Sequence, residues 1–222
     1  SIFIGSYDNN LYSINAATGE FQWKFATEGG IVSMPVFHDS AVYIGSEDNH
    51  VYAISSRTGK MVWNYATEGP IRSSPNIAEG HLFIGSDDGY LYAINLLAQR
   101  RTWRFDAGGP VRSTPFITQD YLYVGSEIGE LLCLDFRGQS KWRFKAKRAI
   151  TSSPLVAQGM VFVGALDSTF YAIDARSGWA LWRYRMGKGT VSSPCRLDNY
   201  VYIGSADGCI YCIDAGTSKE IW

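Results

Sequence analysis

The segment "VYIGSEDNHVYAI", residues 42–54, decides the fold, because it is the pattern of a β-hairpin and it recurs along the chain. Two apolar runs meet at Asp48 and Asn49, and a short polar pair between such runs is typical of a tight β-turn. Its glycine, Gly45, has counterparts at intervals of 39 or 40 residues: Gly5, Gly85, Gly125, Gly164 and Gly204. A period of about 40 residues is typical of β-propellers and other repeat arrays.

A second marker has the same period. A tryptophan lies near the end of each copy of the repeat: Trp23, Trp63, Trp103, Trp142, Trp182 and Trp222. Each complete copy also holds four strand-length runs bounded by turn residues, as at 71–77, 81–86, 90–95 and 101–106. Alternation within these runs is weak, as in strands that are covered on both faces, and no helical period is present. We therefore predict an all-β fold, a β-propeller of four-stranded blades of about 40 residues.

The repeat covers the whole chain, which we predict to be a single propeller domain, residues 1–222, with six blades. Five blades are expected to be complete, at 31–66, 71–106, 111–145, 150–185 and 190–222. Residues 1–26 form a partial blade that lacks its innermost strand, and its open edge is a candidate for self-association. The chain begins without Met and stops at Trp222 within the pattern, so we expect a longer parent protein.

Composition excludes two classes of partner. The net charge is −1, from 20 Lys and Arg against 21 Asp and Glu, so no positive field attracts nucleic acid. No apolar run approaches the roughly 20 residues of a membrane span, and no basic and then apolar signal segment opens the chain. We expect a chain that is soluble as given, without membrane insertion, in a compartment that the sequence leaves unknown.

The segment "AIDARSGWALW", residues 172–182, carries Ala, Asp, Gly and Trp at its first, third, seventh and eleventh positions. This pattern resembles the tryptophan-docking motif of quinoprotein propellers, the PQQ-repeat family, and variants of it end every copy. The glycine suits a turn with positive φ, and the tryptophan offers a flat surface together with an indole N–H that needs an acceptor. We expect the six tryptophans to dock neighbouring blades.

The resemblance implies two kinds of function. Some family members are dehydrogenases that bind pyrroloquinoline quinone and calcium on an eight-bladed ring. Others use the blades without a cofactor, among them propeller domains of bacterial serine/threonine kinases and a lipoprotein of the outer-membrane barrel-assembly machinery. The 222 residues supply about five and a half blades of this period, and the vicinal cysteines of several alcohol-oxidising members are absent. We therefore expect the non-enzymatic branch, with no cofactor and no metal, and a PQQ-dependent dehydrogenase fragment is the alternative.

Several chemically capable side chains recur from copy to copy, which favours a structural role for them. One set is the aspartate of the hairpin turns: Asp8, Asp48, Asp88, Asp167 and Asp207. Another is the serine two residues before a proline: Ser33, Ser73, Ser113, Ser152 and Ser192. No histidine accompanies these serines in the repeat, so a serine hydrolase is not indicated. Cys133 and Cys212 replace alanines and are expected to be small core residues, and neither a disulfide nor a metal site is favoured.

Departures from the repeat are the better guide to function. The linkers between copies read "ATEGG", "ATEGP" and "DAGGP" early in the chain, then "KAKRA" and "RMGKG" late. Arg72 and Arg112 also begin two innermost strands, where other copies carry Val or Thr. We expect a cationic arc that binds a carboxylate, a phosphate or an acidic peptide: Arg72, Arg112, Lys147, Arg148 and Lys188. A solvated charged rim is the alternative interpretation.

These observations favour a non-catalytic propeller that binds a protein or a small anionic ligand. Such a module fits a scaffolding, sensor or interaction domain of a larger protein, for example a receptor-type kinase. A purely structural role, in which two copies pair through the incomplete blade, remains open. The fifth copy differs further, because Ala165 and Leu166 replace the usual polar pair and Trp179 adds an indole outside the repeat.

Overall fold

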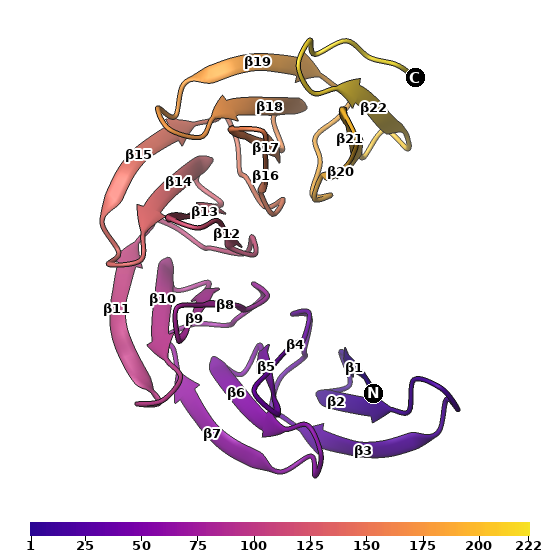
Figure 1. Cartoon of the computed structure of the whole chain (residues 1–222), viewed down its shortest axis with the longest axis vertical. Helices are drawn as coiled ribbons and strands as arrows, with labels where there is room; N and C mark the ends of the chain where they lie inside the picture. The colour runs from indigo at the N-terminus through magenta and orange to yellow at the C-terminus, as the bar shows by residue number, and fades with distance from the viewer. The chain divides into compact units, whose positions relative to one another are not determined.

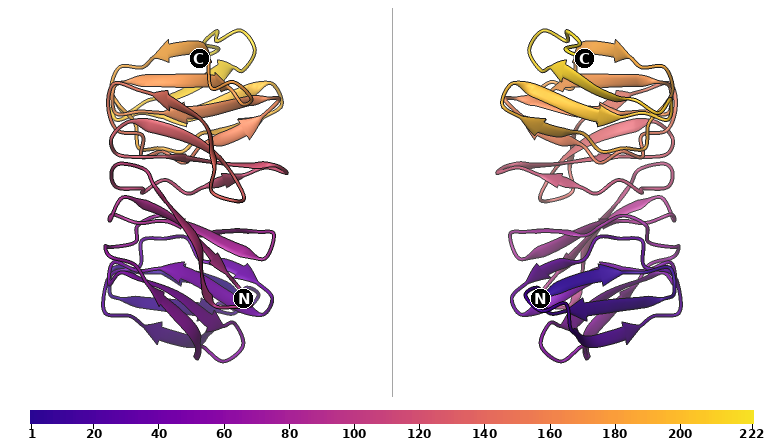
Figure 2. Two further views of the ribbon diagram at one scale, coloured as in Figure 1. Left: turned by 90° about the vertical axis from the view of Figure 1, so that its left-hand side faces the viewer. Right: turned by 90° about the vertical axis from the view of Figure 1, so that its right-hand side faces the viewer.

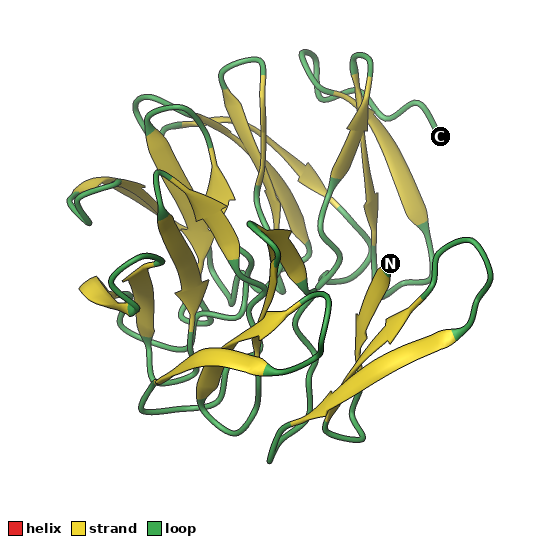
Figure 3. Cartoon of the chain, turned by 60° about the horizontal axis from the view of Figure 1, so that its bottom comes forward, coloured by secondary structure: helices red, strands yellow, loops and turns green.

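The computed structural model describes residues 1–222 and consists of β-strands and loops, with no helix (Figure 3). It accordingly contains no helix with the length and apolar character needed to cross a membrane. The chain divides into two compact units, Ser1–Arg112 and Ser113–Trp222, and each is described by itself.

The first unit holds three antiparallel sheets, in which strands that follow one another in sequence also pair in space (Figure 1). The first sheet has three strands, β1 (Ile2–Gly5), β2 (Asn10–Ile14) and β3 (Phe21–Ala26). The second has four strands, β4 (Val36–His38), β5 (Ala41–Gly45), β6 (His50–Ser55) and β7 (Met61–Ala66). The third also has four, β8 (Asn76–Ala78), β9 (His81–Gly85), β10 (Tyr90–Asn95) and β11 (Arg100–Asp106).

The second unit repeats this arrangement, and its sheets can also be followed in the side views of Figure 2. Its first sheet contains β12 (Phe116–Ile117), β13 (Tyr121–Gly125), β14 (Glu130–Asp135) and β15 (Ser140–Lys145). The next contains β16 (Leu155–Ala157), β17 (Met160–Gly164), β18 (Thr169–Asp174) and β19 (Ala180–Arg185). The last has three strands, β20 (Cys195–Leu197), β21 (Tyr200–Gly204) and β22 (Ile210–Asp214).

The hairpin predicted at residues 42–54 is present. Strands β5 and β6 pair antiparallel, with Gly45 opposite Val51, and Asn49 has a φ of 73° in the turn. That left-handed conformation is one that Asn and Gly tolerate, which explains the Asp-Asn and Asp-Gly pairs of the repeat. All five residues of β5 are buried, as expected from the weak alternation in its sequence.

Two strand predictions need correction. The run 71–77 was expected to form an innermost strand, but β8 begins only at Asn76. Pro75 has no N–H to donate to a sheet ladder, and the residues before it lie against the preceding copy of the repeat instead. The blade expected at 190–222 lacks a fourth strand, because residues after β22 form only an isolated bridge between Ile213 and Glu220.

The core of each unit lies between neighbouring sheets. One cluster of the first unit joins Tyr43 and Val51 of the second sheet to Ile84 and Tyr92 of the third. Ile71, which begins the third copy, belongs to the same cluster and is fully buried. Because copies pack face to face, each copy buries most of its apolar surface only where another copy covers it.

Candidate functional site

The repeated tryptophans join neighbouring copies. The indole N–H of Trp23 donates to the carbonyl oxygen of Ser56 at 3.0 Å, and a Cβ on Gly59 would lie 2.8 Å from the Trp23 ring. Trp142 repeats this in the second unit, with a 3.0 Å bond to the carbonyl of Ala175. Glycine is therefore required where the ring lies on the turn, and the indole N–H is satisfied.

The remaining tryptophans differ in burial. The indole of Trp182 donates to a carbonyl of the last copy at 2.9 Å. Trp63 is 8% exposed and Trp103 is half-buried, whereas Trp222 is 62% exposed. The last tryptophan thus lacks the cover that the earlier ones have.

The hairpin aspartates accept hydrogen bonds within their own turn and also from the linker between two copies. The Asp48 carboxylate accepts hydrogen bonds from the Tyr52 hydroxyl at 2.9 Å and the His50 N–H at 3.0 Å. It also accepts one from the N–H of Glu28, in the linker before its own copy, at 2.9 Å. The sequence predicted the turn but not this hydrogen bond to the linker. A pattern in the sequence accompanies the aspartate, because a tyrosine follows each one by four residues. In the one copy without that tyrosine, Ile128 replaces the aspartate.

The same hydrogen bonds occur in the second unit, where they change the pKa values of the groups that they join. Asp167 accepts from the Tyr171 hydroxyl at 2.6 Å and from the Lys147 N–H at 3.0 Å. Burial, with the hydrogen bond to this carboxylate, raises the pKa of Tyr171 to about 12. At Asp207, desolvation raises the pKa, but hydrogen bonds from the Cys209 N–H, the Tyr211 hydroxyl and other donors outweigh it and lower the pKa to about 2.

These aspartates do not suit the calcium site that a quinone enzyme would need. Each of these aspartates lies in a different copy of the repeat. Their carboxylate oxygens accept hydrogen bonds from hydroxyl and backbone N–H groups, as at Asp48 and Asp167. No group of three or more His, Cys, Asp or Glu side chains is placed to share an ion. Hard cations such as calcium need six to eight oxygen ligands around one point. The hairpin aspartates therefore do not fit a bound calcium ion.

The repeated serines are likewise engaged within the fold. The Ser33 hydroxyl donates to the carbonyl of Gly45 at 2.8 Å and accepts from the Gly45 N–H at 2.9 Å. Ser152 makes the same two bonds with Gly164, at 2.8 and 3.0 Å. Each hydroxyl thus joins the start of a copy to the end of its second strand.

The cysteines are free thiols. Cys133 and Cys212 are buried, in agreement with their expected core positions, whereas Cys195 and Cys209 are exposed. Burial raises the pKa of the Cys133 thiol to about 11.

Two members of the predicted cationic arc lie in the first unit and are paired with carboxylates. The Nε of Arg72 lies 2.7 Å from Glu47, and its Nη1 contacts Asp87. Arg112 binds the same Asp87 through Nε at 2.8 Å and Nη2 at 3.0 Å. Two guanidinium groups therefore meet two carboxylates, and their charges balance locally.

The other three members, Lys147, Arg148 and Lys188, lie in the second unit and are exposed. None of them forms an ion pair. Arg148 and Lys188 line a shallow depression of about 340 Å³ together with Leu166, Ser168, Gly189 and Ala206.

The sequence repeat explains why these cations lack partners. Leu166 and Ala206 occupy the repeat position that Glu47 and Asp87 hold in the first unit. The acids that neutralise Arg72 in the first unit are thus replaced by uncharged residues beside Arg148 and Lys188. The second unit presents a cationic depression with a partly apolar floor.

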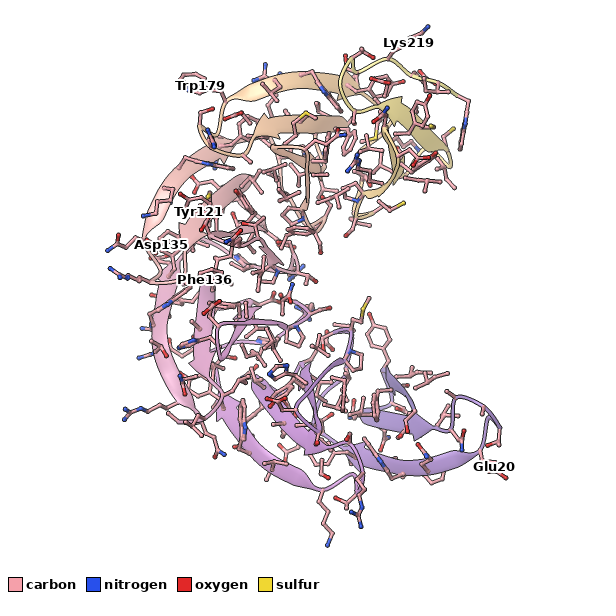
Figure 4. The ribbon with its side chains drawn as sticks, viewed as in Figure 1. Glu20, Tyr121, Asp135, Phe136, Trp179 and Lys219 are labelled. Carbon is pink, nitrogen blue, oxygen red and sulfur yellow. The ribbon has the colours of Figure 1, made fainter.

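Trp179 belongs to a separate surface of the second unit. It is 78% exposed and projects from the loop between β18 and β19, away from the ribbon (Figure 4). With Arg143, Lys145 and Arg183 it lines a depression of about 310 Å³.

Comparisons with known proteins identify the family. The model of the family described as outer membrane protein assembly factor BamB matches residues 7–117 and 99–222. No curated protein sequence matches the chain. Together the two matched ranges cover nearly the whole chain, and they overlap, as expected for a repeat.

Two solved structures have a similar fold over nearly the whole chain. BamB from Moraxella catarrhalis has 20% sequence identity and a TM-score of 0.86, over 99% of this chain and 71% of that one. The computationally designed Ika8 protein has 20% identity and a TM-score of 0.84, over 99% of this chain and 69% of that one. At this identity the likeness shows the fold alone, and the number of blades stays a prediction. The resemblance to PQQ-repeat β-propellers is confirmed, and the chain belongs to the family described as outer membrane protein assembly factor BamB.

Proposed function

We propose that this protein is a non-catalytic binding and scaffolding propeller that holds an acidic segment of a protein partner in the cationic depression of its second unit. The observation that carries the proposal is the replacement of the repeat's acids by Leu166 and Ala206, which leaves the side chains of Arg148 and Lys188 without an ion-pair partner, while the Asp207 carboxylate accepts the backbone N–H of Lys188. The description of the matching family, an assembly factor for outer membrane proteins, supports a protein as the partner.

The chemistry of the depression suits a carboxylate beside an apolar side chain. Arg148 offers a planar guanidinium that binds a carboxylate through two N–H groups, and Lys188 adds a second charge. Leu166, which lines the same depression, supplies an apolar surface. An exposed ion pair contributes only about 0.2–1 kcal/mol, so the affinity depends on several such contacts together. Binding is expected to weaken as salt rises, because the cations lie at the surface.

Arg72 and Arg112 take no part in this proposal, although they belong to the predicted arc. A carboxylate ligand would have to displace Glu47 or Asp87 from them, and the exchange of one carboxylate for another yields little free energy. Lys147 extends the cationic surface of the second unit, since its side chain is exposed and only its backbone N–H is bound to Asp167.

The same binding surface would serve if the chain is a sensor or interaction domain of a larger protein, such as a receptor-type kinase.

A charge-reversal experiment tests the proposal. The probe is a fluorescein-labelled Glu-rich peptide that contains one leucine, and its binding is followed by fluorescence anisotropy at low salt. The variant Arg148→Glu/Lys188→Glu is expected to bind the peptide at least about tenfold more weakly than the unchanged protein. The control Arg57→Glu/Lys60→Glu makes the same change in net charge at exposed cations of the first unit and should bind normally. Equal losses in both variants, or no binding by the unchanged protein, would contradict the proposal.

A further inference from the structure

Strands β9, β10 and β11 of the third sheet are neighbours (Figure 1) and bring three polar side chains into one row. Asn95 of β10 lies opposite His81 of β9 on one side and opposite Arg100 of β11 on the other. Residues directly opposite each other in antiparallel strands carry their side chains on the same face of the sheet. These three residues line a depression of about 470 Å³ together with Ala98, Arg101 and Thr102.

Hydrogen bonds fix the centre of this row. The Nδ1 of His81 lies 2.8 Å from the carbonyl oxygen of Glu79, so Nδ1 carries the ring proton and donates it there. The Nε2 of the same ring therefore accepts, from the Thr102 hydroxyl at 3.0 Å and from the Asn95 amide at 3.4 Å. The Asn95 Oδ1 accepts the N–H of Ala98 at 2.7 Å. Three side chains of the depression are thus held in place before any ligand arrives.

The two arginines of the depression are free of such bonds. Arg100 and Arg101 are exposed, and neither forms an ion pair or a hydrogen bond. The sequence repeat supplies the reason. In the fourth copy Asp135 stands at the position of Asn95, and its carboxylate pairs with Lys141 at 2.7 Å. Because Asn95 carries no charge, the third copy presents two guanidinium charges without a neutralising carboxylate.

The loop beside this row also departs from the pattern of the other copies. Gln99 occupies the position that Gly59 and Gly178 hold, and it keeps their left-handed conformation with a φ of 53°. A Cβ on Gly59 would lie 2.8 Å from the Trp23 ring, so Gln99 closes the place where such a ring lies. The corresponding tryptophan is Trp63, which is 8% exposed and whose indole N–H forms no hydrogen bond. Strain of this kind is characteristic of functional sites.

We propose that this depression binds the phosphate group of a small phosphate monoester through Arg100 and Arg101. A phosphate monoester carries a charge of about −1.5 to −2 near neutral pH, which matches two guanidinium groups, whereas a carboxylate carries only one charge. Each guanidinium binds phosphate oxygens through two N–H groups. The volume of about 470 Å³ falls within the range of small-molecule sites, about 300–1,000 Å³. This site belongs to the first unit and does not depend on the acidic segment proposed for the second.

The test is an NMR titration of the isotopically labelled chain with phenyl phosphate, and with benzoate as the matched carboxylate. We expect saturable shifts at the amides of residues 95–102, with benzoate binding at least about fivefold more weakly. The variant Arg100→Gln/Arg101→Gln should weaken phenyl phosphate binding at least about tenfold. The control Arg57→Gln/Lys60→Gln removes the same charge from the corresponding turn of the second copy and should bind normally. All four side chains are exposed, so both variants should fold.

Other outcomes decide against the proposal. It is overturned if phenyl phosphate causes no saturable shifts, if benzoate binds equally well, or if the control variant loses as much affinity. It is also overturned if vesicles containing phosphatidic acid bind the chain at these residues while phenyl phosphate does not, since a lipid headgroup would then be the ligand. The variant Arg148→Glu/Lys188→Glu should still bind phenyl phosphate, so this proposal and the acidic-segment proposal fail independently.

Discussion

Replacing Gly45 with alanine should destabilise the first unit through one identifiable contact. The new Cβ would lie 2.2 Å from Cγ2 and 3.0 Å from Cβ of Ile71, and 3.1 Å from Cδ1 of Ile84. Carbon atoms prefer separations of about 3.5–4.0 Å, so Ile71 would have to move by more than about 1 Å. Ile71 and Ile84 are fully buried, which leaves no free space for that movement. Overpacking of this kind costs about 1–3 kcal/mol.

A double-mutant cycle isolates the contact. Ile71→Ala alone should cost about 2–5 kcal/mol, because it leaves a cavity in a buried cluster. In the double variant the alanine at 71 has no Cγ2, so most of the clash with the alanine at 45 disappears. The double variant should therefore be more stable than the sum of the single effects predicts, by about 1–2 kcal/mol.

The assay is urea unfolding followed by circular dichroism, with Gly204→Ala as the matched control at the same repeat position. That control should shift the unfolding midpoint little, because its Cβ meets only Ser192 at 3.3 Å. The reasoning would be refuted if the losses in free energy of unfolding for Gly45→Ala and Ile71→Ala simply added in the double variant. Equal losses in Gly45→Ala and Gly204→Ala would refute it as well.

Three further predictions follow from individual contacts. Trp23→Phe removes the 3.0 Å hydrogen bond to Ser56 and should lower stability by about 1–2 kcal/mol, measured by urea unfolding. Because the pKa of Asp207 is lowered from 3.8 to about 2, its contribution to stability is present above pH 3.8 and is lost as pH falls toward 2. The gap in melting temperature between the unchanged protein and Asp207→Asn should accordingly narrow over that interval, and a constant gap would contradict the assignment. A thiol reagent should modify two cysteines rapidly in the native protein and the other two only after unfolding, as peptide mapping can show; the rapid pair is Cys195 and Cys209.

The sequence predicted the parts of the fold that each copy repeats. The spacing of Gly45 and its counterparts predicted the hairpins, and Asp48 with Asn49 predicted the turn, because these features depend on local conformation. The innermost strand was predicted too long at 71–77, since the docking of Ile71 on Gly45 joins two copies and cannot be read from the pattern of one.

The candidate site was predicted only in part. The linkers identified Lys147, Arg148 and Lys188 as departures from the repeat, and the depression contains the last two. Arg72 and Arg112 have the same charge but are only partly exposed, and their pairing with Glu47 and Asp87 depends on contacts between copies. The replacement of those acids by Leu166 and Ala206 was visible in the sequence, but its effect on the cations appeared only once the side chains were placed.

Photo-crosslinking tests the central claim, that the cationic depression of the second unit is the binding surface, most directly. The Glu-rich peptide would carry a benzophenone beside its leucine, and mass spectrometry would locate its attachment points on the unchanged protein. We predict crosslinks concentrated at residues 147–148, 166–168 and 188–189, with competition by unlabelled peptide. Crosslinks at Arg72 and Arg112, or an even spread over both units, would contradict the claim.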